Sequence, residues 1–200
     1  PSPMRASSFP TPHPFHPMTK AEWRALAPYL PTNPTGTGRP ADHRHRLDAI
    51  FHVALPHSPW SALPERFGNP GTVARHFRRL THAGLWQRLL TALATTPPGH
   101  PLHALAHRVC RAARRAHRIL GLGLILLARR LDLRAALPGP PWLLPDPDLS
   151  QTLARAKLPP FTGAYGTVTP YRRLVRGLAA LHRAAAGRAR IPRSLRLGWA

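Results

Sequence analysis

Cysteine is almost absent from this sequence. Cys110 is the only one among 200 residues, which excludes a disulfide within the chain and a zinc site built on cysteines. The 13 His residues do not replace it, because the pairs His43/His45 and His103/His107 have no carboxylate or cysteine at a supporting spacing. We therefore expect no metal and no cofactor, and a reducing compartment such as the cytoplasm.

Acidic residues are also scarce. Seven Asp and Glu stand against 29 Lys and Arg, giving a formal net charge of +22, and 18 of the basic residues but only three acidic ones fall in residues 94–200. Such a chain repels itself unless it meets a polyanion, so nucleic acid is the first candidate partner and an anionic membrane surface the second. Nearly all the basic residues are Arg, the better bidentate donor to phosphate and guanine, although GC-rich coding DNA produces the same bias.

A hydrophobic run long enough to cross a membrane is missing. The best candidate, Ile119–Ala128, is only about half of the ~20 residues required, and Arg118 and Arg129 lie at its ends. Residues 1–17 have no continuous apolar core, so they do not form a secretory signal. The sequence predicts a buried helical segment at 119–128 and no membrane partner.

Proline and capping signals divide the first third of the chain. Six prolines in residues 1–17 remove backbone donors, which predicts a disordered leader. Thr19 and Glu22 form a Thr-x-x-Glu capping box that predicts a helix start. Residues 32–39 contain Asn-Pro and two glycines and read as a flexible connector. A second helix is predicted from Asp42, with apolar residues on one face and basic residues in its first turns.

A helix-turn-helix is predicted next. Leu63–Phe67 has the length of a short helix closed by Gly68, Asn69-Pro70-Gly71 supplies a turn, and a basic helix follows. In that helix Val73, Phe77 and Leu80 recur at i, i+4 and i+7, which turns its basic residues away from the core. The predicted DNA-binding residues are Arg39, Arg44, Arg46, Thr72, Arg75, His76, Arg78 and Arg79. The alternative is that these arginines only solvate an ordinary surface helix.

The remaining residues predict more helix and a Pro-rich segment. The helical stretch from Leu102 to Leu137 has apolar residues along one side and Arg on the other, as in a dimerisation helix or an extra DNA clamp. The expected fold is all-α: a small helix-turn-helix domain followed by a long basic helix and a Pro-rich, partly disordered tail. The expected parts are a leader at 1–17, the helix-turn-helix domain at 18–96, a long helical segment at 97–137, a Pro-rich linker at 138–170, and a basic C-terminal helix and tail at 171–200.

Residues 18–93 resemble the N-terminal helical domain of bacterial insertion-element transposases of the DDE superfamily. The matching motifs are Glu22-Trp23 with Leu30-Pro31, then Gly38-Arg39-Pro40, then Pro59-Trp60-x-x-Leu63-Pro64-x-x-Phe67-Gly68, and finally Val73-x-x-x-Phe77-x-x-Leu80 before Gly84-Leu85-Trp86. The resemblance implies that this domain recognises the terminal inverted repeats of the element. It also implies DNA cutting and strand transfer by a following ribonuclease-H-like domain that holds three carboxylates and two metal ions.

The second part of that pattern is missing here. After Leu93 the acidic residues are Asp132, Asp146 and Asp148, with no Glu and no alternating strand pattern. We therefore carry the DNA-binding role over to the basic helix but not catalysis, and we expect no enzymatic activity from a DDE triad. Two origins explain such a tail: the first product of a two-frame element, or a degenerate copy read out of frame.

The sequence supports three hypotheses about function. The first is a transposase-related, nucleoid-associated protein that binds the terminal repeats of an insertion element as double-stranded DNA, lacks its own nuclease domain, and acts with or against a complete transposase or self-associates. The second is a domesticated helix-turn-helix transcriptional regulator. The third is an inert product that binds any nucleic acid through its arginines.

Overall fold

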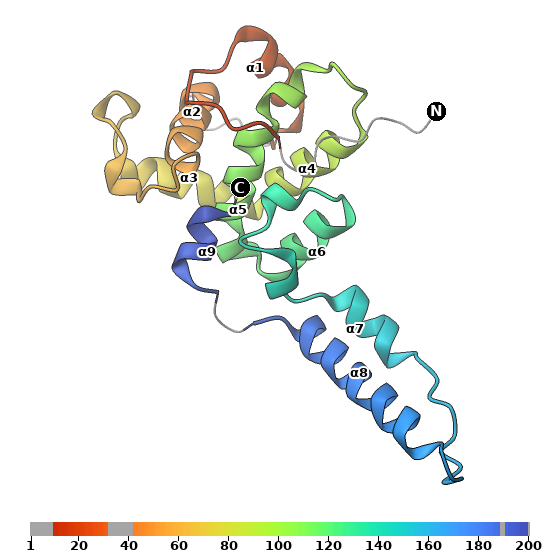
Figure 1. Cartoon of the computed structure of the whole chain (residues 1–200). Coiled ribbons are helices and arrows are strands. Elements are labelled where there is room, and N and C mark those ends of the chain that lie inside the picture. The colour runs from red at the N-terminus through yellow and green to blue at the C-terminus, as the bar shows by residue number, and fades with distance from the viewer. Residues whose placement is uncertain (1–9, 32–41, 189–190, 200) are drawn as a thin grey trace. The chain divides into compact units, whose positions relative to one another are not determined.

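The computed structural model describes residues 10–31, 42–188 and 191–199. Within these residues the chain forms nine α-helices, several 3-10 turns and no strand, so the predicted all-α class is confirmed (Figure 1). The chain divides into two compact units, residues 1–138 with 199–200, and residues 139–198. The predicted connector at 32–39, the Gly38-Arg39-Pro40 motif and Arg39 itself lie outside the described residues.

The first helix starts where the capping box predicts. Helix α1 spans Lys20–Leu26, and a 3-10 turn at Ala27–Tyr29 follows it. The Thr19 hydroxyl accepts a hydrogen bond from the Glu22 amide at 3.2 Å, and the Glu22 carboxylate accepts one from the Thr19 amide at 2.7 Å. These two bonds satisfy backbone donors that the first turn leaves unpaired.

The second helix is separated from the third by 3-10 turns. Helix α2 spans His43–Ala54, with Asp42 as its N-cap, and its apolar face is buried. Two 3-10 turns follow, at Trp60–Ala62 and Glu65–Phe67. The short helix expected at Leu63–Phe67 is therefore only a 3-10 turn, because the proline at position 64 starts the turn in an extended conformation and Gly68 ends it.

Helices α3 and α4 follow with a tight turn between them. Helix α3 spans Pro70–His82 and α4 spans Leu85–Thr95. Gly84 joins them in the left-handed conformation (φ 77°), which residues with a Cβ rarely adopt. Trp86 is fully buried and donates from its indole nitrogen to the Thr81 hydroxyl at 2.8 Å.

We expect the Asn69→Ala substitution to lower the free energy of unfolding by about 1 kcal/mol. The Asn69 side chain accepts hydrogen bonds from the Gly71 amide at 2.8 Å and the Thr72 amide at 3.2 Å, and so caps α3. Urea denaturation followed by circular dichroism would measure the change, with Asn69→Ser as the matched control that keeps a capping oxygen. Equal stability of the Ala variant and the parent protein would show that the cap contributes nothing.

Helix α5 lies at the centre of the first unit. It spans Ala106–Leu120 after a 3-10 turn at Pro101–Leu105, and it packs against α2, α3 and α4. Val109, Cys110 and the alanines of its inner face are fully buried. The predicted apolar stripe is therefore buried from Leu105 to Ala116, where the unit's own helices cover it, so this part is not free for dimerisation.

The long helix predicted up to Leu137 is interrupted. α5 ends at Leu120 and is followed by Gly121 (φ 60°), α6 runs from Leu122 to Arg130, and a 3-10 turn at Arg134–Ala136 follows. The break follows from the Gly-Leu-Gly sequence at 121–123, since glycine favours such backbone angles and weakens helices. In the described parts of the chain no helix has the length and apolar composition needed to span a membrane.

The end of the leader is packed onto the first unit. Residues 10–17 form no regular element, as their prolines predict, but their side chains make contacts. The Phe15 ring lies edge-on to His52 at a centroid distance of 4.8 Å and to Phe67 at 6.0 Å. The ring of His13 packs in the same way on His107 at 5.6 Å.

The second unit is a helical hairpin with short flanking elements. A 3-10 turn at Pro141–Leu143 precedes α7 (Pro147–Ala154), α8 spans Val168–Ala186, and α9 spans Arg193–Gly198. The Asp146 amide donates to the Ala185 carbonyl at 2.8 Å, so the start of α7 is tied to the end of α8 (Figure 1). Gly187 allows this approach, because an added Cβ would meet the Pro145 nitrogen at 2.5 Å. The residues expected to be a linker thus include a helix that packs on α8.

Candidate nucleic-acid interface

Helix α3 has two distinct faces. Its inner face carries the buried residues Val73, His76, Phe77, Leu80 and Thr81. On its outer face Arg75, Arg78 and Arg79 are exposed, and Thr72 is partly exposed. Their spacing of three and four residues places the arginines on one side of the helix. The strong contrast between the two faces is the arrangement that the apolar positions 73, 77 and 80 predict.

No described residue neutralises the arginines of α3. The ion pairs found among the described residues are Arg108–Glu22 and Arg134–Asp132, and neither includes a residue of α3. The three α3 guanidinium groups also make no hydrogen bond to another described residue. Their charge is therefore free to act on a ligand in solution.

Most arginines of the neighbouring helix α5 are used inside the unit. The Arg111 guanidinium donates to the Leu55 carbonyl from Nε at 3.0 Å and from Nη2 at 2.8 Å, and Arg115 donates to the Ser58 carbonyl at 2.7 Å. These carbonyls lie at the C-terminal end of α2 and just beyond it, where helix carbonyls lack partners and cations are favourable. Arg115 also lies over the Trp60 ring at 4.1 Å. Arg111 and Arg115 thus serve packing rather than binding, whereas Arg118 of the same helix is exposed.

Arg44 and Arg46, both predicted DNA-binding residues, lie in different environments. The Arg44 guanidinium donates a hydrogen bond to the Met18 carbonyl and so holds the chain that leads into α1. Arg46 is only partly exposed, and its charge acts on His76 of α3. Of the two, Arg46 is the one that lies beside the basic helix.

His76 is not on the outer face, which corrects the prediction that it turns away from the core. Its exposed fraction is 4%, and its ring lies 5.4 Å from that of His43. Burial, with the charges of Arg46, His43 and Arg79, lowers the pKa of His76 to about 4. The sequence carried the signal, because His76 stands three residues after Val73 and four before Leu80, on the same helical face. A neutral, buried imidazole does not read bases.

One residue that the prediction omitted belongs to this surface. His82 is exposed and stands seven residues after Arg75 and three after Arg79, which places it on the same face of α3. This spacing of three and seven residues was the signal in the sequence that could have found it.

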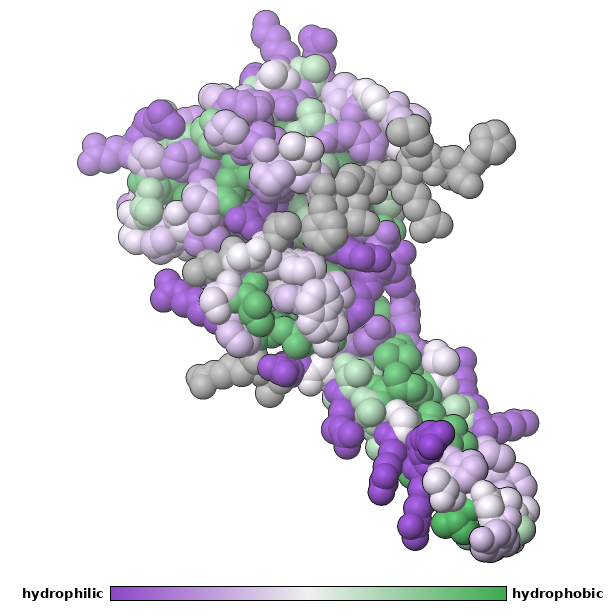
Figure 2. All heavy atoms as spheres, in the orientation of Figure 1, coloured by the Kyte–Doolittle hydropathy of each residue, from purple (hydrophilic) through white to green (hydrophobic). Residues whose placement is uncertain are grey.

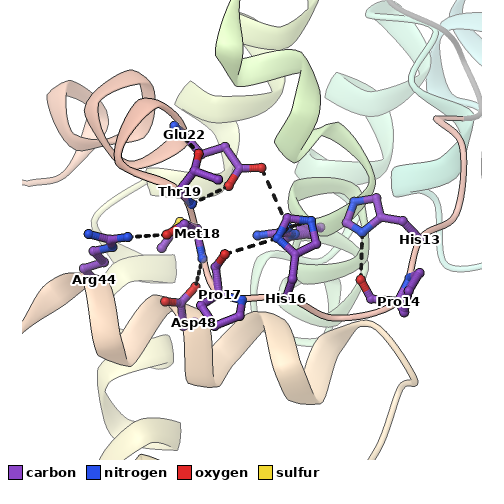
Figure 3. A network of polar contacts seen from close by, with 10 residues as sticks. His13, Pro14, His16, Pro17, Met18, Thr19, Glu22, Arg44 and Asp48 are labelled. Atoms are coloured by element: carbon purple, nitrogen blue, oxygen red, sulfur yellow. Dashed lines mark hydrogen bonds and ion pairs between the residues drawn. The ribbon is translucent and has the colours of Figure 1, made fainter.

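A buried polar network fixes the segment that precedes α1 (Figure 3). The Met18 amide donates to the Asp48 carboxylate at 3.0 Å, and Glu22 lies 3.7 Å from the Arg108 guanidinium. Arg108 also contacts the ring of His16. Burial raises the pKa of Asp48, although the Met18 amide and the Arg44 charge oppose that shift. This network joins α1, α2 and α5 and serves the fold.

The fold and this site define a small α-helical domain with one exposed basic helix. Residues 18–90 match the family described as "Putative transposase of IS4/5 family (DUF4096)". This match confirms the predicted resemblance to the N-terminal domain of an insertion-element transposase for that segment. Comparisons with curated proteins and with solved structures found no match. The matched segment ends within α4, so α5, which packs among its helices, lies beyond it.

The described residues hold no cluster of three or more His, Cys, Asp or Glu side chains that could bind a metal ion. Cys110 is fully buried, and burial raises its pKa to about 12. Its thiol is therefore protonated and poorly reactive at neutral pH.

Proposed function

We propose that this protein binds double-stranded DNA at the ends of an insertion element, with helix α3 lying in the major groove. The observation that carries the proposal is the outer face of α3: three exposed arginines without an internal partner, on a helix whose opposite face is in the core. The neighbouring α5 arginines donate to carbonyls instead. The transposase family of residues 18–90 supports the choice of element ends as the target.

The chemistry of α3 suits base recognition. A helix fits the major groove of B-form DNA, where an Arg side chain can donate two hydrogen bonds to the O6 and N7 atoms of a guanine. Arg75 and Arg79 lie one turn apart and can reach neighbouring base pairs, while Arg78 and His82 lie along the same face. The segment that connects α2 and α3 is longer than the tight turn of a standard helix-turn-helix. The proposal therefore rests on α3 and not on that motif.

We expect Arg75→Ala and Arg79→Ala each to weaken binding to element-end duplex by about 5-fold to 150-fold, which corresponds to about 1 to 3 kcal/mol for a lost base contact. Binding of the full chain to the terminal repeats of its own element and to scrambled duplex of equal composition would be measured by fluorescence anisotropy. Arg24→Ala removes an exposed arginine of α1 and is the matched control, with an expected change below about 2-fold.

The two duplexes separate base recognition from plain charge attraction. If Arg75 and Arg79 contact bases, the substitutions reduce the preference for element ends over scrambled DNA. If the parent protein has no such preference, or if both duplexes lose affinity equally in the variants, α3 does not read the sequence and the proposal is wrong.

A further inference from the structure

The second unit carries a row of arginines on α8. The residues of α8 that are least exposed are Val168, Tyr171, Leu178 and Ala185. At 100° per residue these four share one side of the helix, whereas Arg172, Arg176 and Arg183 lie together on a side about 120° away from it. All three arginines are exposed. α8 therefore has one partly covered side and a separate exposed basic side, while its apolar residues Leu174, Val175 and Leu181 are exposed as well.

Helix α7 packs on the less exposed side of α8. α7 and α8 pack against each other along the hairpin, and backbone hydrogen bonds fix the end opposite the connecting loop, from the Asp146 amide to the Ala185 carbonyl at 2.8 Å and from the Arg188 amide to the Leu143 carbonyl at 2.9 Å. Figure 2 shows hydrophilic side chains projecting from this hairpin beside a hydrophobic strip. The hairpin holds the arginine face of α8 toward solvent.

The positive charge of this unit is not neutralised from within. Residues 139–198 contain ten Lys and Arg but only two acidic residues, Asp146 and Asp148, both at the start of α7. The Asp146 carboxylate caps α7 by accepting from the Leu149 amide at 3.1 Å. Arg172, Arg176 and Arg183 make no hydrogen bond or ion pair with a described residue. An outside anion is required to balance this face.

We propose that the α8 arginine row binds the phosphate backbone of duplex DNA without sequence preference, as a second contact in addition to that of α3. From Arg172 to Arg183 the row extends about 16 Å along the helix. Duplex DNA presents one negative charge per about 1.7 Å of its axis, so each guanidinium in such a row meets a phosphate, which it can bind through two hydrogen bonds. This inference concerns the other unit and does not depend on base recognition by α3.

An anionic lipid surface is the alternative partner for the same charges, because Leu174, Val175 and Leu181 of α8 are exposed. A helix on a membrane inserts its apolar face and keeps its basic residues at the height of the headgroups. We favour duplex DNA because α3 of the first unit presents exposed arginines as well and residues 18–90 match a transposase family. A second copy of the unit is also disfavoured, because two faces of the same strong positive charge repel each other.

The test is the salt dependence of binding to scrambled duplex. The full chain with Arg172→Gln, Arg176→Gln and Arg183→Gln is compared with a control that loses three exposed charges in the first unit, Lys20→Gln, Arg24→Gln and Arg118→Gln. Each lost phosphate contact reduces the slope of log affinity against log salt by about 0.9. We expect a reduction of about 2 to 3 for the α8 variant and of less than about 1 for the control.

Two further measurements make the result decisive. The variant with Arg172→Lys, Arg176→Lys and Arg183→Lys keeps the charges and is expected to keep the parent slope, which separates loss of charge from loss of folding. The α8 Gln variant is also expected to keep the parent ratio of affinities for element-end and scrambled duplex, unlike the Arg75 and Arg79 variants. An unchanged salt slope in the Gln variant would overturn the proposal. Binding to vesicles of phosphatidylserine and phosphatidylcholine is measured with the same variants. If the Gln substitutions weaken binding to these vesicles but not to duplex DNA, the proposal is also overturned.

Discussion

The Arg108→Met variant is expected to lose about 3 to 5 kcal/mol of unfolding free energy, because removing one partner of a buried ion pair leaves the other charge without compensation. Arg108 is fully buried, and Glu22 and Asp48, whose charges act on it, are 5% and 7% exposed. The Glu22 carboxylate lies 3.7 Å from the guanidinium. Methionine fills much of the volume of the arginine side chain without a charge. The loss of unfolding free energy therefore measures the uncompensated charge more than the cost of a cavity. Urea denaturation at pH 7 would measure it.

The control for this prediction is a set of variants that removes the charges together. Glu22→Gln keeps an oxygen for the Thr19 amide, so the capping box is preserved while the negative charge is removed. Adding Glu22→Gln and Asp48→Asn to Arg108→Met is expected to recover part of the loss, since an uncharged network carries no uncompensated ion. A loss below about 1 kcal/mol for Arg108→Met alone would show that water or backbone groups already compensate the two carboxylates.

Local signals in the sequence predicted much of the first unit. The capping box at Thr19 and Glu22 and the apolar spacing of Val73, Phe77 and Leu80 are each set by residues a few positions apart. Such signals act through a single helix turn and need no knowledge of the fold. They therefore gave the start of α1, the apolar positions of the inner face of α3 and the exposure of its arginines correctly, whereas His76 was placed on the wrong face.

Long-range packing could not be predicted in the same way. Arg108 is an ordinary basic residue in the sequence, and only the fold brings it beside Glu22 and the ring of His16. The same holds for Arg111, whose partner is a backbone carbonyl at position 55. Because a carbonyl is present at every residue, no residue type marks it as a partner. Counting arginines therefore overestimated the charge that is available for DNA.

Acidification from pH 7 to pH 5 is expected to lower the unfolding free energy through two buried histidines. Burial is the main cause that lowers the pKa of His76 to about 4, and it does the same for His107. Both values lie below that of an unfolded His, near 6.5. Between these values the unfolded chain binds more protons than the folded one, so stability is complete above pH 6.5 and is lost as the pH falls toward 4. Each histidine accounts for about 2 kcal/mol at pH 5.

Paired substitutions would assign this acid sensitivity to its source. His76→Gln places a side chain that does not titrate in α3 and is expected to reduce the difference in unfolding free energy between pH 7 and pH 5 by about 2 kcal/mol. The matched control, His82→Gln, changes an exposed histidine of the same helix and is expected to leave the difference unchanged. Asp48 acts in the opposite direction at lower pH, because its raised pKa favours the protonated folded state as the pH falls. The alternative outcome is that His76→Gln and the parent protein lose the same unfolding free energy between pH 7 and pH 5. His76 would then take up its proton without opening the packing between α2 and α3, and it would not be a source of the acid sensitivity.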